Sequence, residues 1–224
     1  MTDQLTKAPN PSFRLIPSRF PPVGLFDSVA TAADAEAVMD LVGWTNDRLV
    51  ADRIARLPKP QWVFGSANSS IIMASFLHGA PDGMRFNGPD LGAWYAAKEI
   101  ETAIAEVAHH LRREAIARRE VSMSRTYRTY SAELIGRDYL DIRGRHRDLA
   151  DVYRSDSYHA SQAFGESVRS SGQSGLIFDS LRRRNGTSMV CFIPTSVTKV
   201  VQSDHFKITV AASDRKIVVN RLAA

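Results

Sequence analysis

The sequence has little cysteine, little lysine and no long apolar run. Its single cysteine, Cys191, lies in an apolar stretch, so a disulfide framework is excluded and a cytoplasmic setting is favoured. No stretch approaches the roughly 18 apolar residues of a membrane helix. The first residues are polar and contain prolines, which is unlike a signal peptide. We therefore expect a cytoplasmic protein without a membrane partner.

The motifs of several enzyme classes are also absent. There is no HExxH pair, and the adjacent His109 and His110 would diverge by roughly 100° on a helix, so no metal site is expected. No GxSxG motif surrounds a serine, which argues against a serine hydrolase. The glycine spacing of a Rossmann fingerprint is missing as well.

The composition is typical of a globular protein, and the chain is rich in arginine. Of 224 residues, 44% are hydrophobic and 24% charged, which is enough for a sizeable core in one domain. The net charge of +5 comes almost wholly from arginine, with 23 Arg and 6 Lys. The rigid donor fork of arginine suits phosphate and carboxylate. The excess fits a phosphate-bearing ligand or a nucleic acid, and it fits a merely soluble surface as well.

The first quarter of the chain divides into an arm, an apolar segment and a helical lobe. Residues 1–12 are predicted to be a loose arm. Phe13–Phe26 is apolar, and its prolines predict an extended segment that is neither a helix nor a central strand. Residues 31–60 contain two helical patterns, the first ending at Gly43 and the second before Pro58 and Pro60, and we expect them to form an added lobe.

The remaining patterns predict a mixture of helices and strands. Trp62–Phe64 and Ile71–Leu77 are strand-like, and residues 98–119 have apolar side chains at steps of three and four, which predicts a long helix. Further elements are expected as strands at 122–134, 176–178 and 189–193, a short helix at 158–169 and a C-terminal hairpin that turns near 213–214.

One stretch, Met84–Leu111, carries the strongest candidates for chemistry. It places Arg85 in a loop with a glycine, Tyr95 in a short aromatic strand and Glu106 on the long helix. Glu106 lies opposite the apolar stripe, so it is either a solvated carboxylate or the wall of a cleft, and periodicity does not separate the two. Each residue also has a plainer interpretation: an ion pair for the arginine, a core ring for the tyrosine.

Short motifs follow one another in order along the chain. They are GMRFN at 83–87 with Tyr95 and AIAE at 103–106, LDIRG at 140–144, Tyr158 with Ser161, Gln162 and Gly165, and GLIFDSLR at 175–182. This ordered set resembles the RES-domain family, the toxin half of a class of bacterial toxin–antitoxin modules.

The resemblance implies an α+β fold in which a compact, mixed β-sheet core carries flanking helices, related to ADP-ribosyltransferase toxins. It implies a single domain over residues 1–224 and NAD+ as substrate, with no permanently bound cofactor. The nicotinamide–ribose bond would be cleaved, either to degrade NAD+ with phosphate or water or to transfer ADP-ribose to a protein acceptor. The implied partner is a helix-turn-helix antitoxin that occludes the NAD+ site, so that DNA is contacted only through the antitoxin.

The resemblance also assigns roles. Arg85 would bind the pyrophosphate, with Arg19 sharing that charge, although Arg14 competes with Arg19 for this assignment. The candidate residues on the nicotinamide side are three: Tyr95 would stack on the ring, Glu106 would stabilise the positive charge on the ribose, and Ser180 would fix the nicotinamide or its ribose.

The lobe at 31–60 leaves the acceptor open, because it could dock a protein substrate or contact the antitoxin. A second hypothesis, from a different class, is a basic nucleic-acid-binding module without NAD+ chemistry. It is motivated by the arginine excess, including the run at 182–184.

Overall fold

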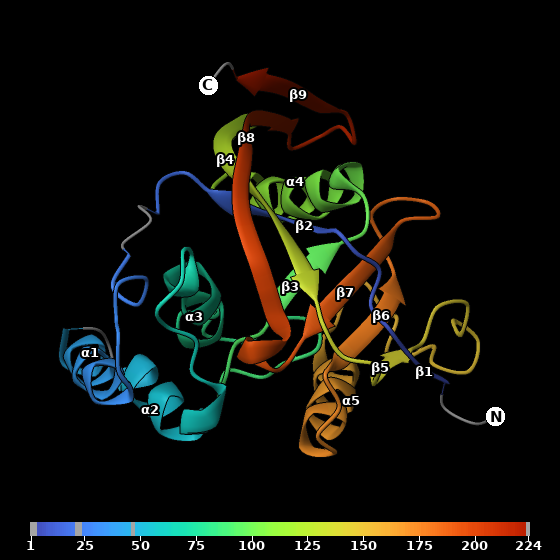
Figure 1. Ribbon diagram of the computed structural model, residues 1–224. Helices are drawn as coiled ribbons and strands as arrows, with labels where there is room; N and C mark the ends of the chain where they lie inside the picture. The colour runs from blue at the N-terminus through green and yellow to red at the C-terminus, as the bar shows by residue number, and fades with distance from the viewer. Residues whose placement is uncertain (1–3, 21–23, 46–47, 223–224) are drawn as a thin grey trace.

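The computed structural model describes residues 4–20, 24–45 and 48–222. Within these residues the strands form one nine-stranded sheet in the order β1-β5-β6-β7-β3-β2-β4-β8-β9 (Figure 1). Neighbouring strands are antiparallel except β5 and β6, which are parallel, so the sheet is mixed. Helices flank this sheet, and the predicted α+β class is confirmed.

The bounds of the elements are as follows. The strands are β1 (Gln4–Thr6), β2 (Ser12–Pro17), β3 (Trp94–Ala97), β4 (Ser122–Leu134), β5 (Tyr139–Asp141), β6 (Gly175–Asp179), β7 (Thr187–Cys191), β8 (Val197–Ala211) and β9 (Ile217–Leu222). The helices are α1 (Ala32–Thr45), α2 (Arg48–Arg56), α3 (Ser69–Leu77), α4 (Ile100–Ala117) and α5 (His159–Ser170), with short 3-10 helices η1 (Lys59–Gln61) and η2 (Pro194–Ser196).

The long helix α4 packs against β2, β4 and β8 through its predicted stripe. Leu111 and Ala115 are fully buried, and Ile104 and Val107 pack against the same cluster. Helix α5 packs beside β6, at the other end of the sheet. The predicted helices at 98–119 and 158–169, the strands at 122–134, 176–178 and 189–193 and the C-terminal hairpin are confirmed, with ends that differ by a few residues.

Helices α1 and α2 do not stand apart from the core. Met39, Val42 and Val50 are buried in one cluster with residues of α3 and of the sheet. Arg53 of α2 is 3% exposed, and its guanidinium donates to the carbonyl oxygens of Leu77 at 2.9 Å, Pro89 at 3.0 Å and Ala80 at 3.3 Å. Through Arg53, α2 holds the two chain segments on either side of Arg85.

Two predictions for the N-terminal segment are wrong. Residues 4–6 are no loose arm, because they form β1 and pair with β5. The segment that follows contains β2, which lies between β3 and β4 inside the sheet. Its only proline, Pro17, is the last residue of the strand, so it does not interrupt the ladder. Pro21 and Pro22, on which that prediction also rested, lie outside the described residues.

The strands predicted at Trp62–Phe64 and Ile71–Leu77 are also wrong. The first stretch joins no strand, and the second belongs to α3. Every side chain from Ile71 to Leu77 except Ala74 is buried, so the run shows no helical stripe. The helix begins where the Asp27 carboxylate accepts hydrogen bonds from the backbone N–H groups of Asn68 and Ser70, at 2.9 and 2.8 Å. Asp27 lies about forty residues before the helix, so local sequence patterns do not reveal this capping interaction.

None of the helices in the described ranges is long and apolar enough to cross a membrane.

Replacement of Arg53 by methionine should destabilise the protein strongly. The three carbonyl oxygens would lose their charged donor, and we expect the free energy of unfolding to fall by roughly 3 kcal/mol, measured by urea denaturation. Arg56→Met on the same helix is the matched control, because Arg56 is exposed and forms a surface ion pair with Asp90. That control should lose less than about 0.5 kcal/mol. Equal losses in the two variants would contradict the role assigned to Arg53.

Candidate functional site

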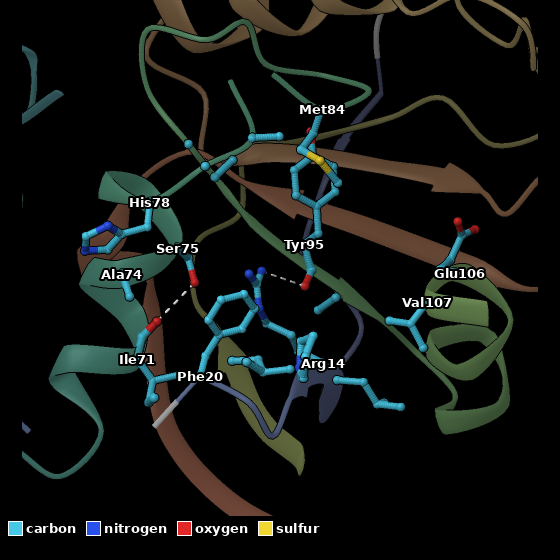
Figure 2. Close-up of a pocket in the computed structure, with 18 of the residues that line it drawn as sticks. Arg14, Phe20, Ile71, Ala74, Ser75, His78, Met84, Tyr95, Glu106 and Val107 are labelled. Carbon is cyan, nitrogen blue, oxygen red and sulfur yellow. Dashed lines mark hydrogen bonds between the residues drawn. The ribbon is translucent and has the colours of Figure 1, made fainter. Parts of the chain in front are cut away.

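A cavity of about 760 Å³ lies between α3 and α4, over the middle of the sheet. Figure 2 shows Glu106 on α4 at one side, α3 with Ala74 at the other, and Arg14 with Tyr95 between them. Arg85 also lines the cavity. The structure therefore brings three of the predicted site residues, Arg85, Tyr95 and Glu106, to one space.

The loop that carries Arg85 is held by α5. The side-chain amide of Gln162 donates to the carbonyl oxygens of Asp82 at 2.8 Å and of Met84 at 3.1 Å. One turn later, the Glu166 carboxylate accepts from the backbone N–H of Gly88 at 2.8 Å. These bonds fix the backbone on both sides of the arginine.

Gly165 allows α5 to pack closely against the loop that carries Arg85. A Cβ atom at Gly165 would lie 2.1 Å from the carbonyl oxygen of Phe86, well inside contact distance. The ring of Phe86 is fully buried and meets the ring of Phe178 edge-on, with centroids 4.7 Å apart. The residue after Arg85 is thus anchored in the core, and the motif residues Gln162 and Gly165 position the loop.

Arg85 keeps its charge without a carboxylate partner. Its side chain is 9% exposed, and Nη1 donates to the carbonyl oxygens of Arg154 at 2.9 Å and of Val152 at 3.4 Å. The guanidinium carbon lies 4.7 Å from the centroid of the Tyr158 ring. Burial lowers the pKa of Arg85, but an arginine remains protonated in proteins. A positive charge is therefore held at the wall of the cavity.

Tyr95 is locked in place by the same loop. Its hydroxyl donates to the side-chain oxygen of Asn87 at 2.8 Å and accepts from the backbone N–H of Phe86 at 2.9 Å. Burial raises the pKa of the phenol, so it is neutral at physiological pH. The hydroxyl is used structurally, and the ring is left as a fixed wall.

Glu106 is not a solvated surface carboxylate. Its side chain is partly buried, and the Ser180 hydroxyl donates to Oε1 at 2.6 Å. The same hydroxyl accepts from the backbone N–H groups of Arg182 and Arg183 at 3.1 and 3.2 Å, which fixes its orientation. Burial raises the pKa of Glu106, and the Ser180 hydrogen bond and the nearby Arg182 and Arg85 charges oppose that shift. The cleft alternative that periodicity left open is the one observed.

Of the two competing arginines, Arg14 lies in the cavity and Arg19 does not line it. Nη1 of Arg14 donates to the carbonyl oxygen of Tyr95 at 3.2 Å, and its guanidinium lies 4.8 Å from the centroid of the Trp94 ring. Burial lowers the pKa of Arg14 to about 10, so it stays charged. Arg19 is exposed and lies over the ring of Phe20.

Two further residues that line the cavity were not predicted as site residues from the sequence. Arg128 of β4 is 6% exposed, lines the cavity and donates to the carbonyl oxygen of Phe20. An arginine in the middle of a predicted strand was a usable signal, since it needs a partner when buried. His110 lies one turn after Glu106 and also lines the cavity. His110 is exposed at its surface, but desolvation by the surrounding groups and the nearby arginine charges lower its pKa to about 4, so the ring is neutral near pH 7.

The cavity is consequently positive with one negative group. Arg14, Arg85 and Arg128 line it, and none of them forms an ion pair with a carboxylate of the described residues. Glu106 is the one acidic residue among the lining residues that the structure describes. Such a space suits an anionic ligand that places an electron-poor centre beside Glu106.

The chain matches a family model, and its structure is similar to a solved structure. The sequence matches the family described as RES domain over residues 50–211. The structure is similar, with a TM-score of 0.44 and 16% identity, to a chain of the M. tuberculosis MbcT–MbcA toxin–antitoxin complex, over 59% of this chain and 74% of that chain. Likeness of that degree says nothing about the chemistry of the cavity. No curated protein sequence matches the chain.

The raised pKa of Glu106 should appear as a pH-dependent effect of Glu106→Gln on stability. The folded protein binds this proton more tightly than the unfolded chain does, so the contribution of Glu106 to stability falls as pH rises from the ordinary value of 4.5 through the raised one. The neutral amide can still accept from Ser180. We expect the variant to melt at a higher temperature than wild type at pH 7, with the difference vanishing near pH 4.

Thermal unfolding followed from about pH 4 to pH 8 measures this. Glu120→Gln, at an exposed position after α4, is the control and should show no such dependence. A wild type that is the more stable of the two at pH 7 would show that Glu106 is not held in a desolvated place.

Proposed function

The chain belongs to the RES-domain family, and from this premise we propose that it is the toxin of a bacterial toxin–antitoxin module and that it consumes NAD+. The proposal rests above all on one observation, the arrangement of three arginines and a single carboxylate around one cavity. NAD+ has the matching charges, because it carries an anionic pyrophosphate and a cationic nicotinamide on the neighbouring ribose.

The pyrophosphate would lie against Arg85 and Arg14. Both guanidinium groups line the cavity and donate to carbonyl oxygens, which leaves their charge uncompensated. A phosphate oxygen can accept from such a group in a charge-assisted hydrogen bond. Arg14 takes the role for which Arg19 was the first choice, since Arg19 does not line the cavity.

The nicotinamide end would lie at Glu106 and Tyr95. The C–N bond to the ribose breaks, the nicotinamide leaves with the bonding electron pair, and positive charge develops on the ribose. The Glu106 carboxylate stabilises that charge, and the Ser180 hydroxyl at 2.6 Å holds the carboxylate in place. The ring of Tyr95, fixed through its hydroxyl, is a surface on which the nicotinamide can stack.

The acceptor completes the reaction by adding an oxygen or other nucleophilic atom to the ribose and losing its proton. Phosphate or water as acceptor makes the protein an NAD+ phosphorylase or glycohydrolase, and a protein side chain makes it an ADP-ribosyltransferase. Val42 of α1 lines the cavity. The lobe thus takes part in enclosing the substrate, which does not require it to dock a protein acceptor.

The proposed partner is a helix-turn-helix antitoxin that covers the cavity and blocks NAD+. DNA would then be contacted only through the antitoxin. Co-expression with a candidate helix-turn-helix protein, followed by purification of the complex, tests for such a partner. The isolated toxin should release nicotinamide and the complex should not.

The competing hypothesis of a nucleic-acid-binding module finds less support. The run at 182–184 does not form one exposed basic patch, because Arg183 donates to the Thr102 hydroxyl at 3.1 Å and lies 3.7 Å from the Glu99 carboxylate. Arg182 lies near Glu106 and contributes to its electrostatics. Of the three, Arg184 is exposed, and Arg182 and Arg183 are partly buried.

Purified protein should release nicotinamide from NAD+, and Glu106→Ala should reduce kcat by about 100- to 1000-fold because the charge on the ribose loses its counter-charge. Ser180→Ala keeps the Glu106 carboxylate but removes the hydrogen bond that orients it, and we expect a smaller decrease in kcat. Glu120→Gln is the control and should retain full activity. The measurement is nicotinamide release in phosphate buffer, in phosphate-free buffer and with cell lysate.

Absence of release under all three conditions would refute the proposal. With NAD+ labelled in its adenylate half, label on a protein band identifies ADP-ribosyl transfer. Free ADP-ribose or its phosphate identifies degradation. Salt-dependent retardation of DNA or RNA by a protein that leaves NAD+ intact would favour the competing hypothesis instead.

A further inference from the structure

The cavity extends well beyond the residues that the proposed chemistry uses. Opposite Glu106 it is closed by α3, where Ile71, Ala74 and Leu77 line it, and by Phe20 and Phe26 from the segment after β2. These side chains carry no charge. The wall at α3 is therefore mostly apolar, with His78 beside it and Arg128 held against it through the carbonyl oxygen of Phe20, whereas the wall at α4 carries the carboxylate.

Arg14 lies between the two walls. Figure 2 shows its guanidinium in the middle of the view, with Phe20, Ile71 and Ala74 toward α3 and Glu106 and Val107 toward α4. In this view the guanidinium lies between Glu106 and α3. The order along the cavity is thus carboxylate, arginine and apolar wall.

Phe20 gives the mostly apolar wall an aromatic surface. Phe20 is 52% exposed although it lines the cavity, so part of this residue is open to solvent. The guanidinium carbon of Arg19 lies 4.9 Å from the centroid of this ring. An exposed ring at the mouth of a cavity offers a flat surface on which a planar base can stack.

We infer that the mostly apolar wall formed by Phe20 and α3 is the subsite for the adenine base of NAD+. The inference rests on the proposed function, and it specifies which half of the dinucleotide lies where. The nicotinamide ribose lies at Glu106, the pyrophosphate passes Arg14, and the base lies between Phe20 and Ala74.

The two serine hydroxyl groups of this wall are already used inside the protein. The Ser75 hydroxyl donates to the carbonyl oxygen of Ile71 at 3.0 Å, and the Ser70 hydroxyl accepts from the backbone N–H of Phe26 at 2.9 Å. The base would therefore be bound by stacking and apolar contact more than by hydrogen bonds to its edge. Binding of this kind adds affinity without distinguishing strongly between purines.

Phe20→Ala tests the subsite when NAD+ is compared with nicotinamide mononucleotide, which lacks the adenylate half. Loss of stacking should lower kcat/KM for NAD+ by about tenfold, mainly through KM. The mononucleotide makes no contact with Phe20, so its kcat/KM should change less than twofold. Ala74→Phe, which places a large side chain in the cavity, should act in the same direction.

The matched control is Ile116→Ala, which removes another exposed apolar side chain, 56% exposed on α4 and outside the cavity lining. This variant should leave kcat/KM unchanged for both NAD+ and the mononucleotide. Equal losses for both substrates in Phe20→Ala, or no loss for either, would overturn the subsite, and thermal unfolding of each variant reports whether it folds.

Binding of ADP-ribose separates this inference from the proposed function. Calorimetry needs no turnover, and the wild type should bind ADP-ribose about tenfold more tightly than Phe20→Ala does. A wild type that binds ADP-ribose in this way but releases no nicotinamide from NAD+ would refute the reaction and keep the subsite. A wild type that cleaves NAD+ but binds ADP-ribose no better than Phe20→Ala does would refute the subsite alone.

Discussion

The cavity depends on arginines whose hydrogen bonds go to main-chain carbonyl oxygens. Arg14, Arg85 and Arg128 all line it, and each donates to one or more carbonyls. A carboxylate partner would cancel the charge, whereas a carbonyl dipole stabilises the guanidinium and leaves the charge in place. Burial of these groups is costly in free energy, and the hydrogen bonds offset that cost. The result is a positive cavity inside an otherwise apolar core.

The fold then adds one carboxylate to this positive cavity. Helix α4 packs on β2, β4 and β8 through its apolar stripe, which turns Glu106 toward the cavity. The turn after β6 brings Ser180 to the same carboxylate from a distant part of the chain. Packing of a helix and pairing of strands therefore determine the distance between the negative group and the arginines. Neither element would place Glu106 usefully without the other.

Sequence patterns predicted the elements whose two faces differ. The stripe of α4, the alternation of β4 and the C-terminal hairpin are of this kind. Helix α3 was mistaken for a strand because it is buried almost all round, and its N-terminal cap is Asp27, a residue about forty positions earlier that no local window includes. Central strand β2 was missed because prolines beyond its last residue suggested an interrupted segment.

Some residues of the candidate site could be predicted from the sequence, and others could not. Arg85, Tyr95, Glu106 and Ser180 could be named from ordered motifs, and the structure brings all four together at or beside the cavity. That Arg14 lines the cavity, whereas Arg19 does not, follows from the position of β2 in the sheet. Sequence spacing does not contain that information, because it is fixed by pairing with strands more than eighty residues away.

The way in which Arg85 is held has a consequence for how this protein can diverge. Its closest hydrogen-bond acceptor is the carbonyl oxygen of Arg154, while the side chain of Arg154 points to an exposed ion pair with Asp156. Every amino acid supplies the same carbonyl. The side chain at position 154 can therefore change while its backbone carbonyl continues to accept the hydrogen bond from Arg85. The interaction does not require an arginine at position 154.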